Sequence, residues 1–107
     1  MIGHLGERIP FDLWRLDHRL SKLPGRPAKR TMAEYFRNNF YITTSGNFSN
    51  PALLCCVMEM GIDHILFAVD WPFVMNKPAT QWMESVPLCD EDKAKILSGN
   101  AKRLLKM

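Results

Sequence analysis

The stretch that is most informative about the fold is Ile65-Leu66-Phe67-Ala68-Val69-Asp70-Trp71-Pro72-Phe73. Five consecutive apolar residues precede an aspartate, and a proline ends the run two positions later. Such a run is typical of a strand buried on both faces. Because functional residues gather at the carboxyl ends of parallel strands, Asp70 is a candidate site residue. An aspartate that only caps the following turn fits the same pattern, so both interpretations stay open here.

Length and composition limit the class of protein. A chain of 107 residues predicts one domain, residues 1–107, and its 47% hydrophobic and 23% charged residues are ordinary for a globular protein. The net charge of +3 is dispersed and no nucleic-acid-binding module is recognisable, so we expect no nucleic-acid partner. No apolar run approaches the roughly 18 residues of a membrane span, so we expect no membrane partner either.

The three cysteines, Cys55, Cys56 and Cys89, form neither a disulfide framework nor a metal-binding Cys-x-x-Cys pair. This pattern favours a reducing compartment, and the expected location is the cytoplasm. Cys56 falls on the apolar face of a predicted helix, which favours a buried thiol over a reactive one.

Strands and helices alternate along the chain. Caps, prolines and apolar spacing predict helices over 10–20, 31–38, 50–60 and 90–105, strands over 40–44 and 65–69, and a short segment over 79–85. In the last helix, the expected apolar face is Ala94, Leu97, Ala101, Leu104 and Leu105, with a break or kink at Gly99-Asn100. Met1 and Ile2 read as the end of another strand.

This order predicts an α/β fold with a parallel sheet and right-handed crossovers. Only two complete strands are expected, whereas a (β/α)8 barrel takes about 250 residues. The sequence therefore predicts an incomplete TIM barrel, the C-terminal portion from the end of strand 6 to the closing helix.

Three further polar side chains are candidates. The glycines of Gly3-His4-Leu5-Gly6-Glu7 allow a tight turn that brings His4 and Glu7 to one side, as a local hydrogen bond or as a catalytic pair. From its position alone, Arg15 is a surface cation whose stem packs on Trp14. His64, at the entry to the strand over 65–69, is expected to be structural.

Four motifs carry a family resemblance. The segments 3–18 (GHLGERIPFDLWRLDH), 41–48 (YITTSGNF), 65–73 (ILFAVDWPF) and 99–106 (GNAKRLLK) closely resemble the C-terminal part of the amidohydrolase-related decarboxylases. Among these, the chain most resembles the fungal-type 2,3-dihydroxybenzoate and salicylate decarboxylases, with γ-resorcylate and aminocarboxymuconate-semialdehyde decarboxylases as relatives.

The resemblance implies a carboxy-lyase that removes carbon dioxide from a hydroxybenzoate, such as 2,3-dihydroxybenzoate, with one divalent metal ion. Zinc is the first expectation, and manganese or magnesium suits the same ligands. Asp70 matches the metal-binding aspartate, His4 and Glu7 match the active-site histidine and its glutamate, and Phe73 matches an aromatic residue of the substrate pocket. Arg15 matches an arginine that reaches a neighbouring subunit's site, which implies a homo-oligomer, a dimer or tetramer.

The family's other metal ligands, on an early and a middle strand, have no counterpart in these 107 residues. One aspartate cannot hold a metal that ordinarily needs three or more protein ligands. We therefore expect the isolated chain to be inactive. The alternative to a decarboxylase part is a non-catalytic truncated remnant that associates with a full-length relative.

Overall fold

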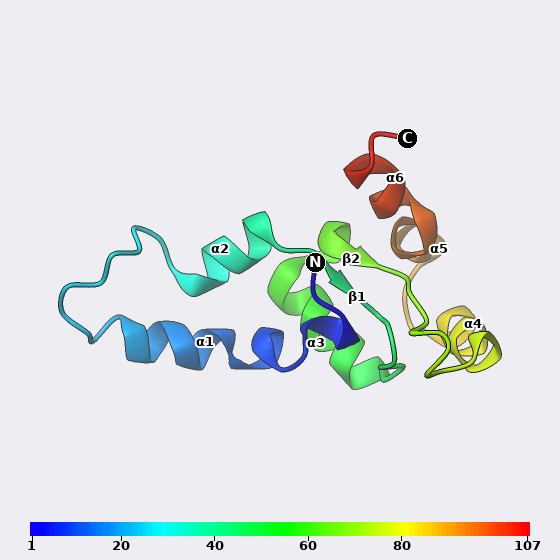
Figure 1. Ribbon diagram of the computed structural model, residues 1–107, viewed down its shortest axis with the longest axis horizontal. Helices are drawn as coiled ribbons and strands as arrows, with labels where there is room; N and C mark the ends of the chain where they lie inside the picture. The colour runs from blue at the N-terminus through cyan, green and yellow to red at the C-terminus, as the bar shows by residue number, and fades with distance from the viewer.

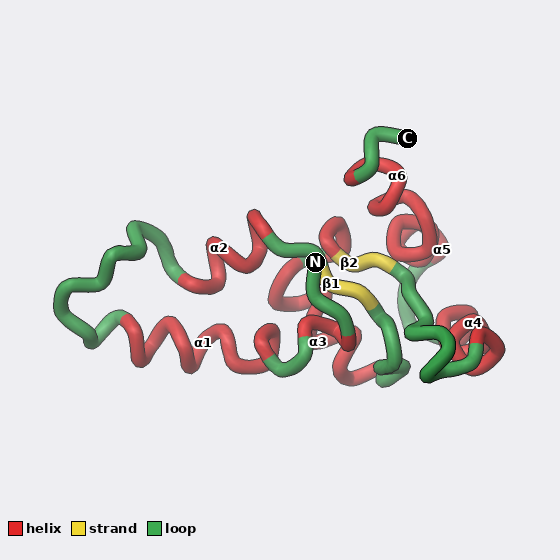
Figure 2. Tube along the Cα trace, in the orientation of Figure 1, coloured by secondary structure: helices red, strands yellow, loops and turns green.

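Three parallel extended segments lie at the centre of the fold. The computed structural model describes all residues from 1 to 107. Strands β1 (Ile42–Thr43) and β2 (Ile65–Leu66) pair in parallel, with Ile42 opposite Ile65. Ile2 forms a parallel bridge to Ile42, on the other edge of β1. Figure 2 shows the N-terminal segment beside β1. The predicted parallel α/β arrangement, with Ile2 as a third segment, is therefore confirmed.

Both strands are shorter than the sequence predicts. The run over 65–69 stays extended beside β1, because Thr44 N–H donates to Leu66 O and Gly46 N–H donates to Val69 O. The amides of Phe67 and Ala68 do not bond to the backbone of the β1 segment. Phe67 N–H donates to Ile96 O at 2.8 Å, and Ala68 N–H donates to the side-chain hydroxyl of Thr44. The predicted burial holds for β2, whereas residues 67–69 are half-buried.

Helices account for most of the remaining chain. The α-helices are α1 (Ile9–Leu20), α2 (Met32–Asn39), α3 (Asn50–Met60), α4 (Asn76–Ser85), α5 (Asp90–Ala94) and α6 (Asn100–Leu104). Short 3₁₀ turns, η1 (His4–Gly6) and η2 (Ile62–His64), precede α1 and β2. None of the helices combines the length and the apolar character that a membrane crossing requires.

Helices α1 and α2 form an arm that extends away from the strands (Figure 1). The carboxylate of Asp17 on α1 accepts hydrogen bonds from the Met32 and Ala33 amides at 2.6 and 3.1 Å. These amides are free donors at the start of α2, so Asp17 ties the two helices together. The predicted capping box between Thr31 and Glu34 is present at the same helix start.

The closing helix departs from the predicted apolar face. A π-helical turn, η3 (Lys95–Gly99), lies between α5 and α6 and changes the helical register. Ile96 and Asn100 are therefore fully buried, whereas Leu97 and Leu105, which the prediction placed inside, are 49% and 65% exposed. The predicted irregularity is correct, but the face that it presents to the core is not the expected one.

The core packs α1, α2, α3, α4 and η3 around the strands. Its fully buried members include Ile42 and Ile65 from the strands and Leu13, Leu53 and Ile96 from the helices. Cys56 belongs to the same cluster, as the sequence predicts. This core holds the carboxyl ends of β1 and β2 beside η1, where the candidate site lies.

Candidate functional site

His4, Glu7 and Asp70 come together beyond the ends of the parallel strands. His4 Nδ1 lies 2.6 Å from Glu7 Oε1, and His4 Nε2 lies 3.4 Å from Asp70 Oδ2. His4 and Asp70 are 66 positions apart in the sequence, so this contact depends on the fold. The fold therefore brings the predicted candidates His4, Glu7 and Asp70 into one cluster.

The backbone at this cluster adopts a conformation that L-residues rarely take. The φ angles are +50° at His4, +56° at Glu7 and +80° at Asp70. Backbone conformations of this kind cost about 1–3 kcal/mol each and concentrate at functional sites. All three residues of the cluster share the feature, as do Leu5 and Lys106 elsewhere in the chain.

The two carboxylates determine how His4 holds its proton. The hydrogen bond to Glu7 and then that to Asp70 raise the pKa of His4 above its ordinary value. The His4 side chain is 46% exposed and that of Asp70 is 33% exposed, so a small molecule can reach both. The cluster can therefore supply a proton from a positioned imidazolium.

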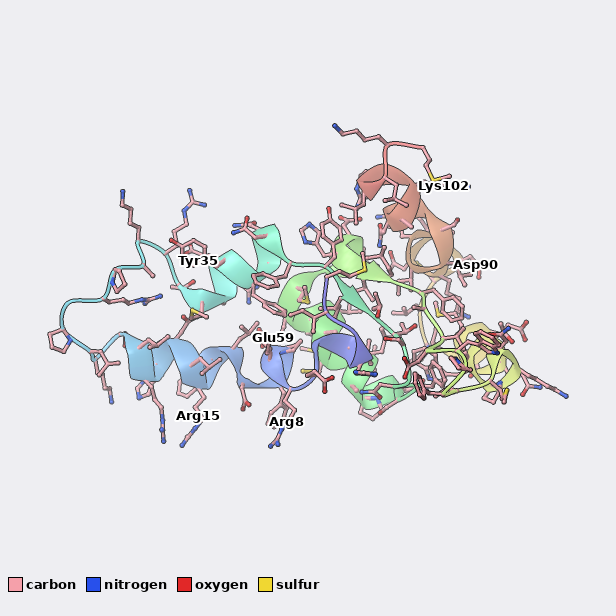
Figure 3. The ribbon with its side chains drawn as sticks, viewed as in Figure 1. Arg8, Arg15, Tyr35, Glu59, Asp90 and Lys102 are labelled. Carbon is pink, nitrogen blue, oxygen red and sulfur yellow. The ribbon has the colours of Figure 1, made fainter.

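The other predicted residues lie at different distances from this cluster. Phe73 is 86% exposed, and its amide donates to Asp70 O at 2.9 Å, so it belongs to the loop that carries Asp70. Arg15 lies on α1 and points away from the rest of the chain (Figure 3). The fold does not bring Arg15 to the cluster of its own chain.

The remaining predicted histidine and cysteines have structural settings. His64 Nδ1 lies 2.9 Å from Phe40 O, and its ring stacks on Tyr41, which agrees with the structural role predicted for it. Burial raises the pKa of Cys56 to about 12 and also raises the pKa of Cys55. Neither thiol is therefore activated as a nucleophile.

A groove of about 500 Å³ lies beside the cluster, between the η1 end of the chain and the start of α3. Glu7 lines it together with Phe11, Asn47, Ser49 and Cys55, among others. Five of its ten lining residues are hydrophobic, and Glu7, which bonds to His4, is among the others. This groove was not predicted, because its lining comes from two stretches that lie far apart in the sequence, 5–11 and 47–56.

The chain does not contain a complete metal centre. No group of three His, Cys, Asp or Glu side chains lies close enough together to hold a metal ion. The oxygen of Asp70 and the imidazole of His4 are suitable donors for a divalent cation, but two donors are fewer than such a site ordinarily takes.

Sequence reasoning missed the segment between β1 and α3. The Ser45 hydroxyl accepts a hydrogen bond from His4 N–H at 3.2 Å, and Gly46 borders both His4 and Asp70. The signal for this role was available in the run Thr43-Thr44-Ser45-Gly46, which places three hydroxyls and a glycine at the carboxyl end of the strand predicted over 40–44.

Comparison with known proteins assigns the chain to one family. The amidohydrolase family model matches residues 13–107. The chain is 44% identical over 110 residues to a gamma-resorcylate decarboxylase of Polaromonas sp. and 46% identical to one of Rhizobium radiobacter. Each alignment covers all of this chain and 34% of the relative.

Solved structures agree in fold. A 2,6-dihydroxybenzoate decarboxylase in complex with 2,6-dihydroxybenzoate matches with a TM-score of 0.92 and 46% identity, over 99% of this chain and 34% of that one. A dihydroxybenzoic acid decarboxylase from Polaromonas sp., with manganese and the inhibitor 2-nitroresorcinol bound, matches with a TM-score of 0.91 and 45% identity, over 98% and 33%. The chain thus spans about a third of the length of the proteins that it matches.

Proposed function

We propose a decarboxylase site for this chain, which belongs to the amidohydrolase family. In the proposed reaction a hydroxybenzoate loses carbon dioxide without a change of redox state. The chain would supply His4, Glu7 and Asp70. The observation that carries the proposal is the meeting of these three acid–base side chains at the carboxyl ends of parallel strands, in a chain whose relatives are named decarboxylases.

The proton requirement of the reaction suits His4. When the bond between the ring and the carboxylate breaks, its electron pair remains on the ring carbon, which then takes a proton. In this proposal His4 donates that proton, and the hydrogen bonds that raise its pKa favour the protonated imidazole. Glu7, hydrogen-bonded to Nδ1, fixes the orientation of the ring and leaves Nε2 on the side of Asp70.

We propose Asp70 as one ligand of a divalent metal ion, whose remaining ligands lie outside these 107 residues. Such an ion, when bound, supplies a Lewis acid for the carboxylate and hydroxyl of the substrate. Solved structures of a dihydroxybenzoic acid decarboxylase and of a 5-carboxyvanillate decarboxylase contain manganese, together with 2-nitroresorcinol and 4-hydroxy-3-methoxy-5-nitrobenzoic acid respectively. Manganese is therefore the first ion to test, ahead of the zinc that the sequence favoured and of magnesium.

The relatives named above act on γ-resorcylate, which is 2,6-dihydroxybenzoate, so this compound is the first substrate to test. The 2,3-dihydroxybenzoate expected from the sequence remains the second. Phe73, exposed on the loop that carries Asp70, is proposed to contact the aromatic ring.

A homo-oligomer, a dimer or tetramer, is part of the proposal. Arg15 points away from its own site (Figure 3). Phe11 and Trp14, which also lie on α1, are 80% and 72% exposed. Exposed aromatic residues around an arginine are typical of a protein interface. In the oligomer, Arg15 would reach the aromatic carboxylate in a neighbouring subunit's site.

A chimeric enzyme tests the function. The 107 residues replace the aligned third of the Polaromonas gamma-resorcylate decarboxylase, and carbon dioxide release from 2,6-dihydroxybenzoate is measured with manganese present. We expect turnover by the chimera, and a loss of 100-fold or more with His4→Gln, which is of the order that positioned general acids contribute.

The matched control is His64→Gln, which changes a histidine with a structural setting. We expect this control to keep most of the turnover. A folded chimera that has no activity, or equal activity in the two histidine variants, would contradict the proposed role of the cluster.

The alternative function is that of a non-catalytic remnant that associates with a full-length relative. Its support is the same exposed pair on α1, Phe11 and Trp14. It predicts that the chain co-purifies with such a relative through Phe11 and Trp14. A Trp14→Ser variant should then lose the association.

A further inference from the structure

The segment Thr43–Gly46 contacts both parts of the candidate site, which are the turn that carries His4 and the strand that leads to Asp70. On one side, the Thr43 and Ser45 hydroxyls lie 2.8 Å apart, and Ser45 Oγ accepts the His4 amide hydrogen bond at 3.2 Å. This pair fixes the strained turn that carries His4. Each hydroxyl in the pair is held by the other, so the acceptor for His4 has a defined position.

On the other side, Thr44 fastens the strand that leads to Asp70. Its side chain is fully buried, and Oγ1 donates to Ala68 O at 2.8 Å while it accepts from Ala68 N–H at 3.0 Å. One hydroxyl thus satisfies both polar groups of the residue two positions before Asp70. A buried pair of bonds of this kind is costly to break, because both backbone groups would lose their partners.

Gly46 lies between the two side chains that meet. A Cβ atom at this position would stand 3.0 Å from Asp70 Oδ2 and 3.1 Å from His4 Cδ2. Its φ of +67° resembles that of Gly25, +71°, yet a Cβ at Gly25 would meet nothing within 4 Å. What distinguishes Gly46 is therefore the space that it leaves and not only its backbone angle.

We propose that Thr44 and Gly46 are positioning residues that set the contact between His4 and Asp70. Thr44 holds the approach to Asp70, Ser45 holds the turn of His4, and Gly46 leaves the space in which the imidazole and the carboxylate meet. The inference rests on the proposed function for its meaning in catalysis, whereas its geometric content can be tested without turnover.

The test reads the contact directly in the 107-residue chain. The ring nitrogen resonances of His4 are recorded by NMR at one pH at which His4 is protonated, with and without Asp70→Asn. In the wild-type background we expect Asp70→Asn to shift the Nε2 resonance, because the charged partner is lost. In the Gly46→Ala background we expect that shift to vanish, because the added methyl group separates the two side chains.

Gly25→Ala is the matched control, since it imposes a similar backbone penalty in open space. We expect the Asp70→Asn effect on Nε2 to persist in this background. An effect of the same size in Gly46→Ala and in wild type would overturn the role of Gly46. Loss of the effect in both glycine variants would also overturn it, because the cause would then be backbone strain in general.

Thr44 provides a second test should Gly46→Ala fail to fold. Thr44→Ser keeps the hydroxyl, and Thr44→Val keeps the shape without it. We expect the Asp70→Asn effect to survive in Thr44→Ser and to shrink at least twofold in Thr44→Val. Equal effects in the two variants would overturn the role of the hydroxyl.

The failures of the two proposals are distinguishable. If the chimera is inactive while the Nε2 shift depends on Gly46 as described, the positioning holds and the decarboxylase site fails. If the chimera is active while the shift is independent of Gly46 and Thr44, the function holds and the positioning inference fails.

Discussion

At the scale of single residues, the candidate site shows where sequence reasoning succeeds and where it ends. Gly3 and Gly6 correctly predict a tight turn, but Gly3 is extended, and His4, Leu5 and Glu7 themselves take the positive φ angles. The strain is held by tertiary contacts such as the Ser45 hydroxyl. Those contacts join distant segments, so no local pattern indicates them.

The charge on Glu7 is expected to control the titration of His4. Glu7→Gln replaces the charged acceptor of the first hydrogen bond by a neutral amide oxygen, which weakens that bond, so the pKa of His4 should fall toward its ordinary value near 6.5. NMR titration of the His4 ring measures this, with the exposed Glu91→Gln as the control that leaves it unchanged. An unaltered pKa in Glu7→Gln would contradict the assigned cause.

The same pairing has a consequence for stability. A raised pKa in the folded state means that the folded chain binds the His4 proton more tightly than the unfolded chain. The stabilisation is fully present below about pH 6.5 and is lost as the pH rises through the folded-state pKa. Denaturation by urea at pH 5.5 and pH 8.5 should show a smaller difference in Glu7→Gln than in wild type.

The three thiols should differ in reactivity. Cys89 is exposed, whereas Cys56 is buried, donates to Leu5 O and has a pKa of about 12. We expect iodoacetamide to alkylate Cys89 first and to reach Cys56 only when the chain unfolds. Mass spectrometry of digested samples measures the order, and early modification of Cys56 in the folded chain would be the contrary result.

At the scale of elements, local signals predicted helix starts better than helix faces. The capping box at Thr31 and the stop at Gly61 are confirmed, because each depends on residues within one turn. The face of the closing helix was predicted wrongly, because the π-helical turn η3 adds a residue between α5 and α6. Asn100 accompanies that turn, donating to Ile62 O and Ile65 O at 2.8 Å each.

The capping box predicts a measurable loss. Thr31→Ala removes the acceptor of the Glu34 amide and a donor to its carboxylate, and should lower the free energy of unfolding by about 1 kcal/mol. Thr80→Ala is the control, since the Thr80 hydroxyl only bonds to carbonyls of its own helix. Urea denaturation compares the two, and an equal loss in both would contradict a specific capping role.

At the scale of the whole molecule, the order of elements was sufficient to predict the parallel arrangement, and the four motifs were sufficient to predict the family. The lengths of the strands were not predictable, because residues beyond Leu66 bond to Thr44 and Ile96, which lie far away in the sequence. The contact between His4 and Asp70 has the same origin. Proximity across 66 residues is a property of the fold and not of either motif.

The isolated chain is expected to be inactive. Since no three side chains come close enough to hold a metal, added zinc, manganese or magnesium should not produce carbon dioxide from 2,6- or 2,3-dihydroxybenzoate. The measurement is product release at high chain concentration, with the chimera as the positive control. Turnover that depends on metal in the isolated chain would contradict this account of the site.

The most direct test of the central claim, that this chain contributes a metal-binding carboxylate to a decarboxylase site, is the manganese content of the purified chimera. Asp70→Asn is compared with Asp90→Asn, which changes an exposed aspartate at the start of α5 (Figure 3). We expect Asp70→Asn to lose most of the bound manganese and all measurable turnover, and Asp90→Asn to keep both. Full manganese content in a folded Asp70→Asn chimera would contradict the central claim.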